Sequence, residues 1–275
     1  MRSIPRRHWR LVRKSIKTTA GESLPRNRIA MLSALMLCLE SCSCGWKNSG
    51  QPHSSGIQPA ALIWRTDINS PDGPGHLLEA ITRTKIDGRD AWRVTHYDLD
   101  PTTTSTNDFD LYDIDASSLK PIRSVMQNGE FRLEIVFDQK LATFHRVDKD
   151  GSVLEKVPLS TNIMPEGPGH TALVASLPLR EGFVTRYYIL DRWAGTGPSR
   201  IKEVILSVNR RLSLATEMGT KDAFEVESRA VDGSFRIVEY DRTRPPFYPF
   251  RLEYTRDSKT SVSDVVSILV QQEDK

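Results

Sequence analysis

From residue 61 onward, apolar and polar residues alternate in short segments separated by turn dipeptides. In residues 131–137, an apolar row at 131, 133, 135 and 137 alternates with Arg132, Glu134 and Val136. This period of two predicts a strand whose apolar row faces a core. Asn128-Gly129 precedes the segment, and Asp-Gly pairs at 87–88, 150–151 and 232–233 join other such segments. Both dipeptides tolerate the positive φ of a tight hairpin turn. The pattern therefore predicts a meander of ten or more antiparallel strands.

The predicted strands share this alternation and are bounded by Gly, Pro, Asn or Asp. They cover 62–68, 77–86, 89–97, 131–137, 141–147, 152–159, 183–190, 201–209, 212–217, 223–231, 234–241, 249–255 and 262–270. One stretch lacks the alternation: residues 165–169 are predicted as a loop and residues 170–177 as a short helix ended by Pro178. The predicted fold is mainly β, a strongly curved antiparallel sheet or incomplete β-barrel with one short helix in or over the concave face. Whether the sheet closes is left open.

The N-terminal region has a different character. Ile29 to Leu39 form an uncharged, mostly apolar run after a leader rich in Arg and Lys. The run is too short for a membrane span, which needs about 20 residues, and is typical of a secretory signal. Residues 39–42 (Leu-Glu-Ser-Cys) resemble a bacterial lipobox, so Cys42 is the predicted lipidation site, with Cys38 and Cys44 as alternatives. An ordinary cleaved signal or an uncleaved basic tail stays open.

These features predict three regions. Residues 1–41 are a signal peptide with a long basic n-region, residues 42–59 carry the lipidated cysteine and a flexible tether, and residues 60–272 form a single β-rich half-barrel domain. The expected location is the cell envelope, with the domain anchored by its lipid and facing the periplasm. In a Gram-negative envelope, Ser43 after the cysteine favours the outer membrane.

The composition of the chain without residues 1–41 narrows the range of possible partners and active sites. Taking the nine basic and two acidic residues of 1–41 from the totals of 38 and 35 leaves 29 and 33, a net charge near −4. This balance gives no support for nucleic acid as a partner. All three cysteines fall within residues 38–44. The predicted domain therefore has neither a disulfide, nor a thiolate nucleophile, nor a zinc–thiolate site.

Three short segments resemble one bacterial family. They are residues 113–123 (Asp-Ile-Asp-Ala-Ser-Ser-Leu-Lys-Pro-Ile-Arg), residues 173–183, which contain Pro-Leu-Arg-Glu-Gly-Phe, and residues 251–254 (Arg-Leu-Glu-Tyr). Over roughly residues 60–270 the chain is similar to the family of domain of unknown function 3108, exported proteins placed near the lipoprotein carriers of the Lol system by fold. The resemblance implies an antiparallel half-barrel with an inner helix, and it brings neither an agreed activity nor catalytic residues. The Gly-Thr/Glu-Phe pattern before the late strands is matched only loosely, at 222–224.

No motif predicts a metal or nucleotide site. Asp108, Asp110, Asp113 and Asp115 do not fit a calcium loop, and on a strand they divide between its two faces, so a solvated turn or edge strand is the favoured interpretation. The histidines of the domain have no ligand spacing; they are His76, His96, His145 and His170. There is no Gly-x-Ser-x-Gly elbow, and the Gly-Thr-Gly at 195–197 is too short to cradle phosphate. No cofactor is predicted.

Aromatic residues gather in the C-terminal half and include Phe183, Tyr187, Tyr188, Trp193, Phe247, Tyr248, Phe250 and Tyr254. Most such residues fill a core, but some are expected to line an apolar ligand site inside the curved sheet. The predicted lining comprises Leu173, Leu177, Phe131, Leu133, Ile135, Tyr187 and Phe250.

The sequence leaves three functional hypotheses. The first is a non-enzymatic envelope lipoprotein that binds an apolar ligand, either a lipid or the acyl chain of a lipidated partner, in its concave sheet beneath the helix. The second is a structural or protein-interaction module with a filled core and partner binding at a sheet edge. The third is an enzyme, which requires acids or histidines distant in sequence to converge in one cleft.

Overall fold

The computed structural model describes residues 59, 61–71, 73–99, 108–193 and 197–270. The first eight strands form what we call the first arm of a sheet; they are β1 (Leu62–Ser70), β2 (Gly73–Ile86), β3 (Arg89–Asp98), β4 (Phe109–Asp115), β5 (Pro121–Gln127), β6 (Phe131–Phe137), β7 (Leu141–Asp148) and β8 (Gly151–Pro158). The others form the second arm; they are β9 (Ile163–Met164), β10 (Val184–Leu190), β11 (Ile201–Thr216), β12 (Gly219–Ala230), β13 (Phe235–Arg242), β14 (Pro249–Arg256) and β15 (Lys259–Val270). Between β9 and β10 lies the helix α2 (Pro168–Ala175), and η2 (Gly197–Arg200) precedes β11.

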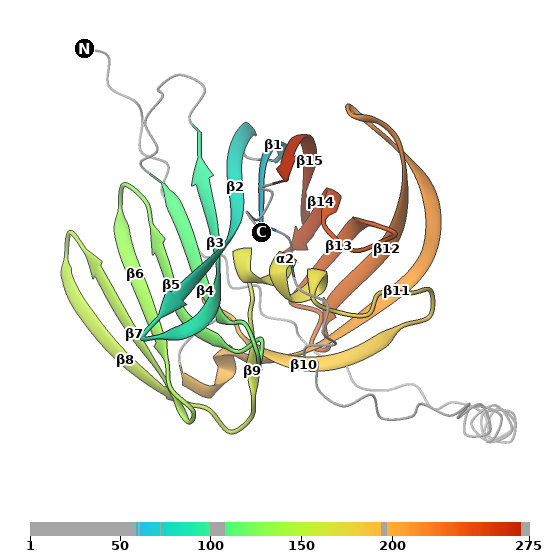
Figure 1. Cartoon of the computed structure of the whole chain (residues 1–275). Coiled ribbons are helices and arrows are strands. Elements are labelled where there is room, and N and C mark those ends of the chain that lie inside the picture. Colours follow the sequence, from blue (N-terminus) through green and yellow to red (C-terminus); the bar gives the residue numbers. More distant parts are fainter. Residues whose placement is uncertain (1–58, 60, 72, 100–107, 194–196, 271–275) are drawn as a thin grey trace, which may run out of the picture. The chain divides into compact units, whose positions relative to one another are not determined.

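The two arms make one sheet because β1 pairs with β15. Across the described residues the strand order runs from β8 through β1 to β15 and on to β9. Neighbouring strands are antiparallel, and the two-residue β9 runs parallel to β10. The sheet curves strongly without closing into a barrel, and α2 lies between its arms (Figure 1). The predicted fold class is confirmed.

Two strand predictions need correction. Residues 109–115 and 121–127 form β4 and β5 in the interior of the first arm, whereas the pattern predicted a solvated turn or edge strand for the first segment and no strand for the second. Residues 201–209 and 212–217 are one strand, β11, because a register shift between Val208 and Arg210 absorbs the polar interruption. A bulge of this kind lets a strand continue while it bends.

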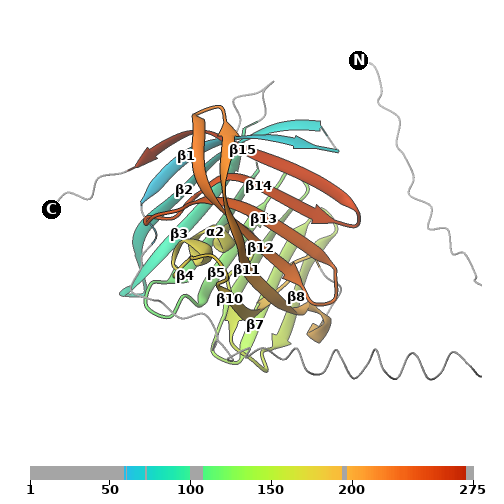
Figure 2. The same cartoon turned by 90° about the vertical axis from the view of Figure 1, so that its right-hand side faces the viewer.

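The helix is buried on every side. It begins at Pro168 and ends at Ala175, rather than spanning 170–177, because proline is well accommodated in the first turn of a helix. Ser176 follows the last turn, and its Oγ donates to the carbonyl of Ala172 at 2.8 Å. All eight residues of α2 are buried. A helix that is buried all round needs contacts on all sides, and both views place α2 between the two arms (Figures 1 and 2).

Gly169 permits the close contact of α2 with the first arm. A Cβ atom at this position would lie 2.7 Å from Cβ of Pro165 and 2.8 Å from Cδ1 of Tyr112. Tyr112 is fully buried in β4, so its ring cannot move aside. A side chain at 169 would therefore push the start of the helix away from the sheet.

The arms also contact each other near the two edges of the sheet, where β6 and β8 of the first arm approach β9, β10 and η2. Leu133 and Ile135 of the first arm share a core cluster with Ile163 and Leu190 of the second arm. Glu155 of β8 accepts from the backbone N–H of Gly197 at 2.7 Å and pairs with Arg200 at 3.1 Å. These contacts hold η2 against β8.

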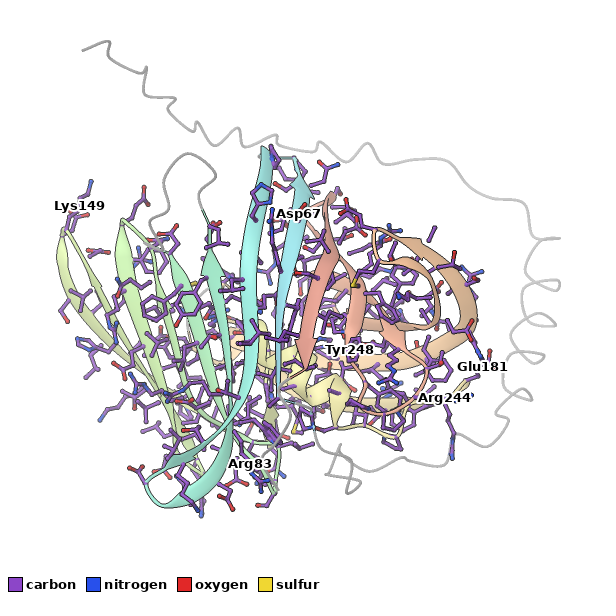
Figure 3. The ribbon with its side chains drawn as sticks, turned by 45° about the horizontal axis from the view of Figure 1, so that its top comes forward. Asp67, Arg83, Lys149, Glu181, Arg244 and Tyr248 are labelled. Atoms are coloured by element: carbon purple, nitrogen blue, oxygen red, sulfur yellow. The ribbon has the colours of Figure 1, made fainter. Side chains whose placement is uncertain are left out.

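The surface of the sheet is rich in charged side chains (Figure 3). Lys149, in the turn after β7, and Glu181, before β10, lie at opposite sides of the sheet in this view. Among the described residues, no helix is long and apolar enough to cross a membrane.

Candidate functional site

A cavity of about 300 Å³ lies beside the start of α2, between the second arm and strands β3 and β4. This volume is at the lower end of the range for small-molecule sites. Its lining comprises His96, Asp110, Glu166, Gly167, Pro168, His170, Thr171, Tyr187, Ile189, Asp191, Arg192, Trp193, Val204, Phe235, Ile237, Glu239, Leu252, Tyr254 and Arg256.

One wall of the cavity is apolar. It consists of Ile189 on β10, Val204 on β11, Phe235 and Ile237 on β13, and Leu252 and Tyr254 on β14. The strand register places Ile237 opposite Tyr254 and Glu239 opposite Leu252, so these side chains share one face of the sheet. Trp193 borders the cavity and is 57% exposed, so the cavity reaches the surface beside this residue.

The opposite end is ionic, and Arg192 is at its centre. This side chain is 4% exposed and donates to both carboxylate oxygens of Asp110 at 2.7 Å. Its Nε lies 2.6 Å from Oε1 of Glu166. Because Asp110 belongs to β4 and Arg192 follows β10, the cluster connects the two arms and the loop before α2. Gly167 is part of this packing, since a Cβ there would collide with the Arg192 guanidinium.

Burial raises the pKa of Glu166 to about 7, although the nearby Arg192 charge acts in the opposite direction. Its ordinary value is 4.5, so the folded protein holds this proton over a range in which the unfolded chain releases it. The stabilisation from this proton is complete below pH 4.5 and is lost as the pH rises to about 7.

Replacing Glu166 by glutamine should remove this pH dependence. We expect the difference in unfolding free energy between Glu166→Gln and the wild type to change by about 2–3 kcal/mol between pH 4.5 and 7.5, in favour of the variant at the higher pH. Urea unfolding at a series of pH values measures the difference. Glu217→Gln, in the exposed turn after β11, is the control and should show a flat difference. A flat difference for Glu166→Gln as well would show that folding does not raise the pKa of Glu166.

A second polar cluster connects α2 to the second arm. Nδ1 of His170 lies 3.2 Å from Oε1 of Glu239, and Nε2 lies 3.0 Å from the Ser228 hydroxyl and 3.2 Å from the Tyr187 hydroxyl. With Nδ1 donating to Glu239, Nε2 can accept from the Ser228 hydroxyl, and the Tyr187 hydroxyl can donate to Ser228 at 3.5 Å. Burial is the main cause of the raised pKa of Tyr187.

The contact order Ser228–His170–Glu239 is that of a Ser–His–acid hydrolase. The serine is 1% exposed, however, and does not border the cavity, so its Oγ is not presented to a molecule bound there. We interpret this cluster as the polar attachment of α2 to the sheet.

His96 completes the ionic end. Its Nε2 is 2.6 Å from Oε2 of Glu79, and Glu79 also accepts from the hydroxyl of Thr66 at 2.8 Å. Burial opposes protonation of His96, but the charge and hydrogen bond of Glu79 outweigh it and raise the pKa of His96. Acids and histidines distant in sequence therefore do converge at this cavity.

The structure separates the predicted apolar lining residues. Tyr187 borders the cavity, whereas Leu173 and Leu177 are in the core cluster around α2. Leu133 and Ile135, with half-buried Phe131 against them, pack on β9 and β10. Phe250 belongs to a fourth cluster and meets Tyr248 edge to face at 5.6 Å between ring centroids (Figure 3 labels Tyr248).

The acidic segment is not the solvated turn or edge strand that the sequence favoured. β4 lies in the interior of the sheet, between β3 and β5. Its acidic side chains can occupy this position because they form ion pairs or hydrogen bonds with neighbouring groups. Asp113 is fully buried and bonds Arg93 through both oxygens, at 2.7 and 3.0 Å. Asp110 faces the cavity and Arg192, and Asp115 accepts from the backbone and hydroxyl groups of Ser117 and Ser118. Asp108 precedes the strand and is half-buried.

The remaining predicted positions lie elsewhere. Nδ1 of His76 is 2.7 Å from Asp67, and Nε2 of His145 is 2.9 Å from Ser152. The described residues do not include the predicted signal peptide at 1–41, most of the predicted tether at 42–58 with Cys42, or Gly195. In the part of the chain that the structure describes, no three His, Cys, Asp or Glu side chains are grouped to hold a metal ion.

Sequence reasoning missed Glu166, Arg192 and Glu239. A signal existed for Glu239, because it stands in phase with Phe235 and Ile237 on an alternating strand and therefore had to face inward. Arg192 follows directly after an apolar strand end, but nothing in the sequence identifies Asp110 and Glu166 as its partners.

No protein-family model matches this sequence, and no curated protein is significantly similar to it. The likeness to the family of domain of unknown function 3108 thus stays a resemblance. Among solved structures, the chain is similar to a β-barrel-like protein of domain of unknown function 1849 from Brucella abortus, with 10% identity, coverage of 79% of this chain and 100% of that one, and a TM-score of 0.46. A Vibrio parahaemolyticus domain with a proposed role in outer membrane lipoprotein sorting is 8% identical, and the match covers 78% of this chain and 87% of that domain, with a TM-score of 0.32. A protein of the family of domain of unknown function 1329 from Desulfovibrio piger is 6% identical, and the match covers 80% of this chain and 94% of that protein, with a TM-score of 0.34. Similarity at this level transfers no ligand and no function.

Proposed function

We propose that this chain is an exported, lipid-anchored envelope protein that binds an amphipathic molecule in the cavity beside α2. The observation that carries the proposal is the cavity itself, which has an apolar wall from β10, β11, β13 and β14 facing an ionic end around Arg192. Such a site suits a molecule with an apolar part and a polar group. The lipid anchor at Cys42 and the periplasm-facing location come from the N-terminal sequence pattern.

Binding without catalysis is the favoured activity because both arginines and His96 at the cavity are each paired with a carboxylate. Asp110 and Glu166 contact Arg192, and His96 pairs with Glu79. Arg256 donates to Asp191 at 2.6 Å. A general base or a nucleophile needs to be presented to the reacting molecule, and these groups hold the arms together instead.

Filling the cavity should abolish binding. In native mass spectrometry of the full-length protein purified without delipidation, we expect an adduct in the mass range of a lipid or fatty acid. The adduct should be lost in Leu252→Trp, because Leu252 is on the apolar wall, and retained in Leu269→Trp. Leu269 is the matched control, 63% exposed on the neighbouring strand β15.

An unliganded mass for the wild type, also after incubation with lipids, would overturn the proposal. It would favour the interaction module, for which the structure offers one specific feature. The edge strand β8 presents Val153 and Leu154, which are 62% and 63% exposed. Exposed apolar side chains on an edge strand are typical of a site where a further strand pairs.

A further inference from the structure

The lining of the cavity contains more carboxylates than guanidinium groups. Four carboxylates border it, those of Asp110, Glu166, Asp191 and Glu239, against the guanidinium groups of Arg192 and Arg256. Arg192 forms ion pairs with Asp110 and Glu166, and Arg256 forms one with Asp191. This pairing leaves Glu239 without a guanidinium partner.

Glu239 is held in a position where its charge is poorly compensated. The residue is 1% exposed, and only its Oε1 contacts His170. Its Oε2 has no hydrogen-bond partner among the described residues. A buried carboxylate oxygen normally has a donor, and leaving it without one is unfavourable. A donor supplied by a bound molecule would remove this penalty.

The ion pairs of the described residues give Glu239 no guanidinium or ammonium partner. Asp241, on the same face of β13, is also buried, and burial followed by the charge of Glu239 raises the pKa of Asp241 well above its ordinary value. The contact of Glu239 with His170 involves only Oε1, at 3.2 Å. The positive charge that His96 carries when protonated is matched by Glu79.

We propose that the cavity selects amphipathic molecules that carry an amino group over those that carry an acidic group. The inference rests on the proposed function and specifies its ligand. The apolar part of the molecule packs on the wall at Ile237, Leu252 and Tyr254, and its ammonium faces the carboxylate of Glu239. An ammonium has three donors and no acceptor, which suits this surplus of acceptors, whereas a carboxylate or phosphate is repelled.

The test compares dodecylamine, dodecanol and dodecanoate, which share one alkyl chain and differ in the polar group. Isothermal titration calorimetry with the full-length protein at pH 7.5, below the micellar concentration of each probe, gives the three affinities. We expect dodecylamine to bind at least tenfold more tightly than dodecanoate, with dodecanol between them. Dodecanoate affinity equal to or above that of dodecylamine overturns the inference and leaves the proposed function standing. Absence of binding for all three probes overturns the proposed function.

Variants identify the group responsible. Glu239→Gln should reduce the dodecylamine affinity about tenfold and leave dodecanol within twofold. Glu253→Gln is the matched control, because Glu253 is the next residue after Leu252 on β14, does not border the cavity and contacts Tyr240 at 3.3 Å. Equal dodecylamine affinity in Glu239→Gln and Glu253→Gln would exclude Glu239 as the recognition group. The comparison of probes on the wild type stands even where a variant folds poorly.

Discussion

Replacing Arg192 by methionine is expected to lower the free energy of unfolding by about 3–5 kcal/mol. Methionine fills much of the same volume but leaves the carboxylates of Asp110 and Glu166 without their positive partner. Removal of one partner from a buried ion pair is strongly destabilising because the remaining charge has lost its hydration without compensation. Urea unfolding followed by circular dichroism measures the change.

Two further variants separate this effect from the loss of a long side chain. Arg186→Met removes a pair with Glu203 at 3.1 Å, in which the arginine is 50% exposed, and should change stability by no more than about 1 kcal/mol. Adding Asp110→Asn to Arg192→Met should recover part of the loss, because it removes the unpaired charge of Asp110. Equal, small losses for Arg192→Met and Arg186→Met would show that the buried cluster does not hold the arms together.

Replacing Leu173 by alanine is expected to lower the free energy of unfolding by about 2–5 kcal/mol. Leu173 is fully buried in α2 and belongs to the cluster that includes Leu206 and Val226 of the second arm. Deleting its side chain leaves a void that a helix packed on all sides cannot collapse to fill. Leu269→Ala, on an exposed position of β15, is the control and should stay within about 0.5 kcal/mol.

The same variant distinguishes a core residue from a ligand contact. Because Leu173 does not border the cavity, dodecylamine affinity of folded Leu173→Ala should stay within about threefold of the wild type. Leu252→Ala should show the reverse, a weaker affinity with a smaller loss of stability. Loss of affinity at Leu173 with little loss of stability would instead place it on the ligand surface, as the sequence predicted.

Local patterns were sufficient to predict most of the strands. Phe131–Phe137 has the predicted bounds because its alternation and the preceding Asn-Gly turn specify both its faces and its start. β4 was missed because its aspartates looked solvated, and a sequence does not show that Arg93 and Arg192 are placed to pair with them. Curvature was predicted correctly from the single helix, which an open sheet of many strands can bury only by bending around it.

The sequence by itself determined most of the strand pattern and the presence of one buried helix, because each depends on residues close together in the chain. It could not determine the cavity. Asp110, Glu166 and Arg192 come from three distant segments, and only the folding of the two arms around α2 brings their charges together. The same packing decided that Leu173 is in the core whereas Leu252 faces the cavity, because the register between strands, and not hydrophobicity, selects which apolar side chains remain uncovered.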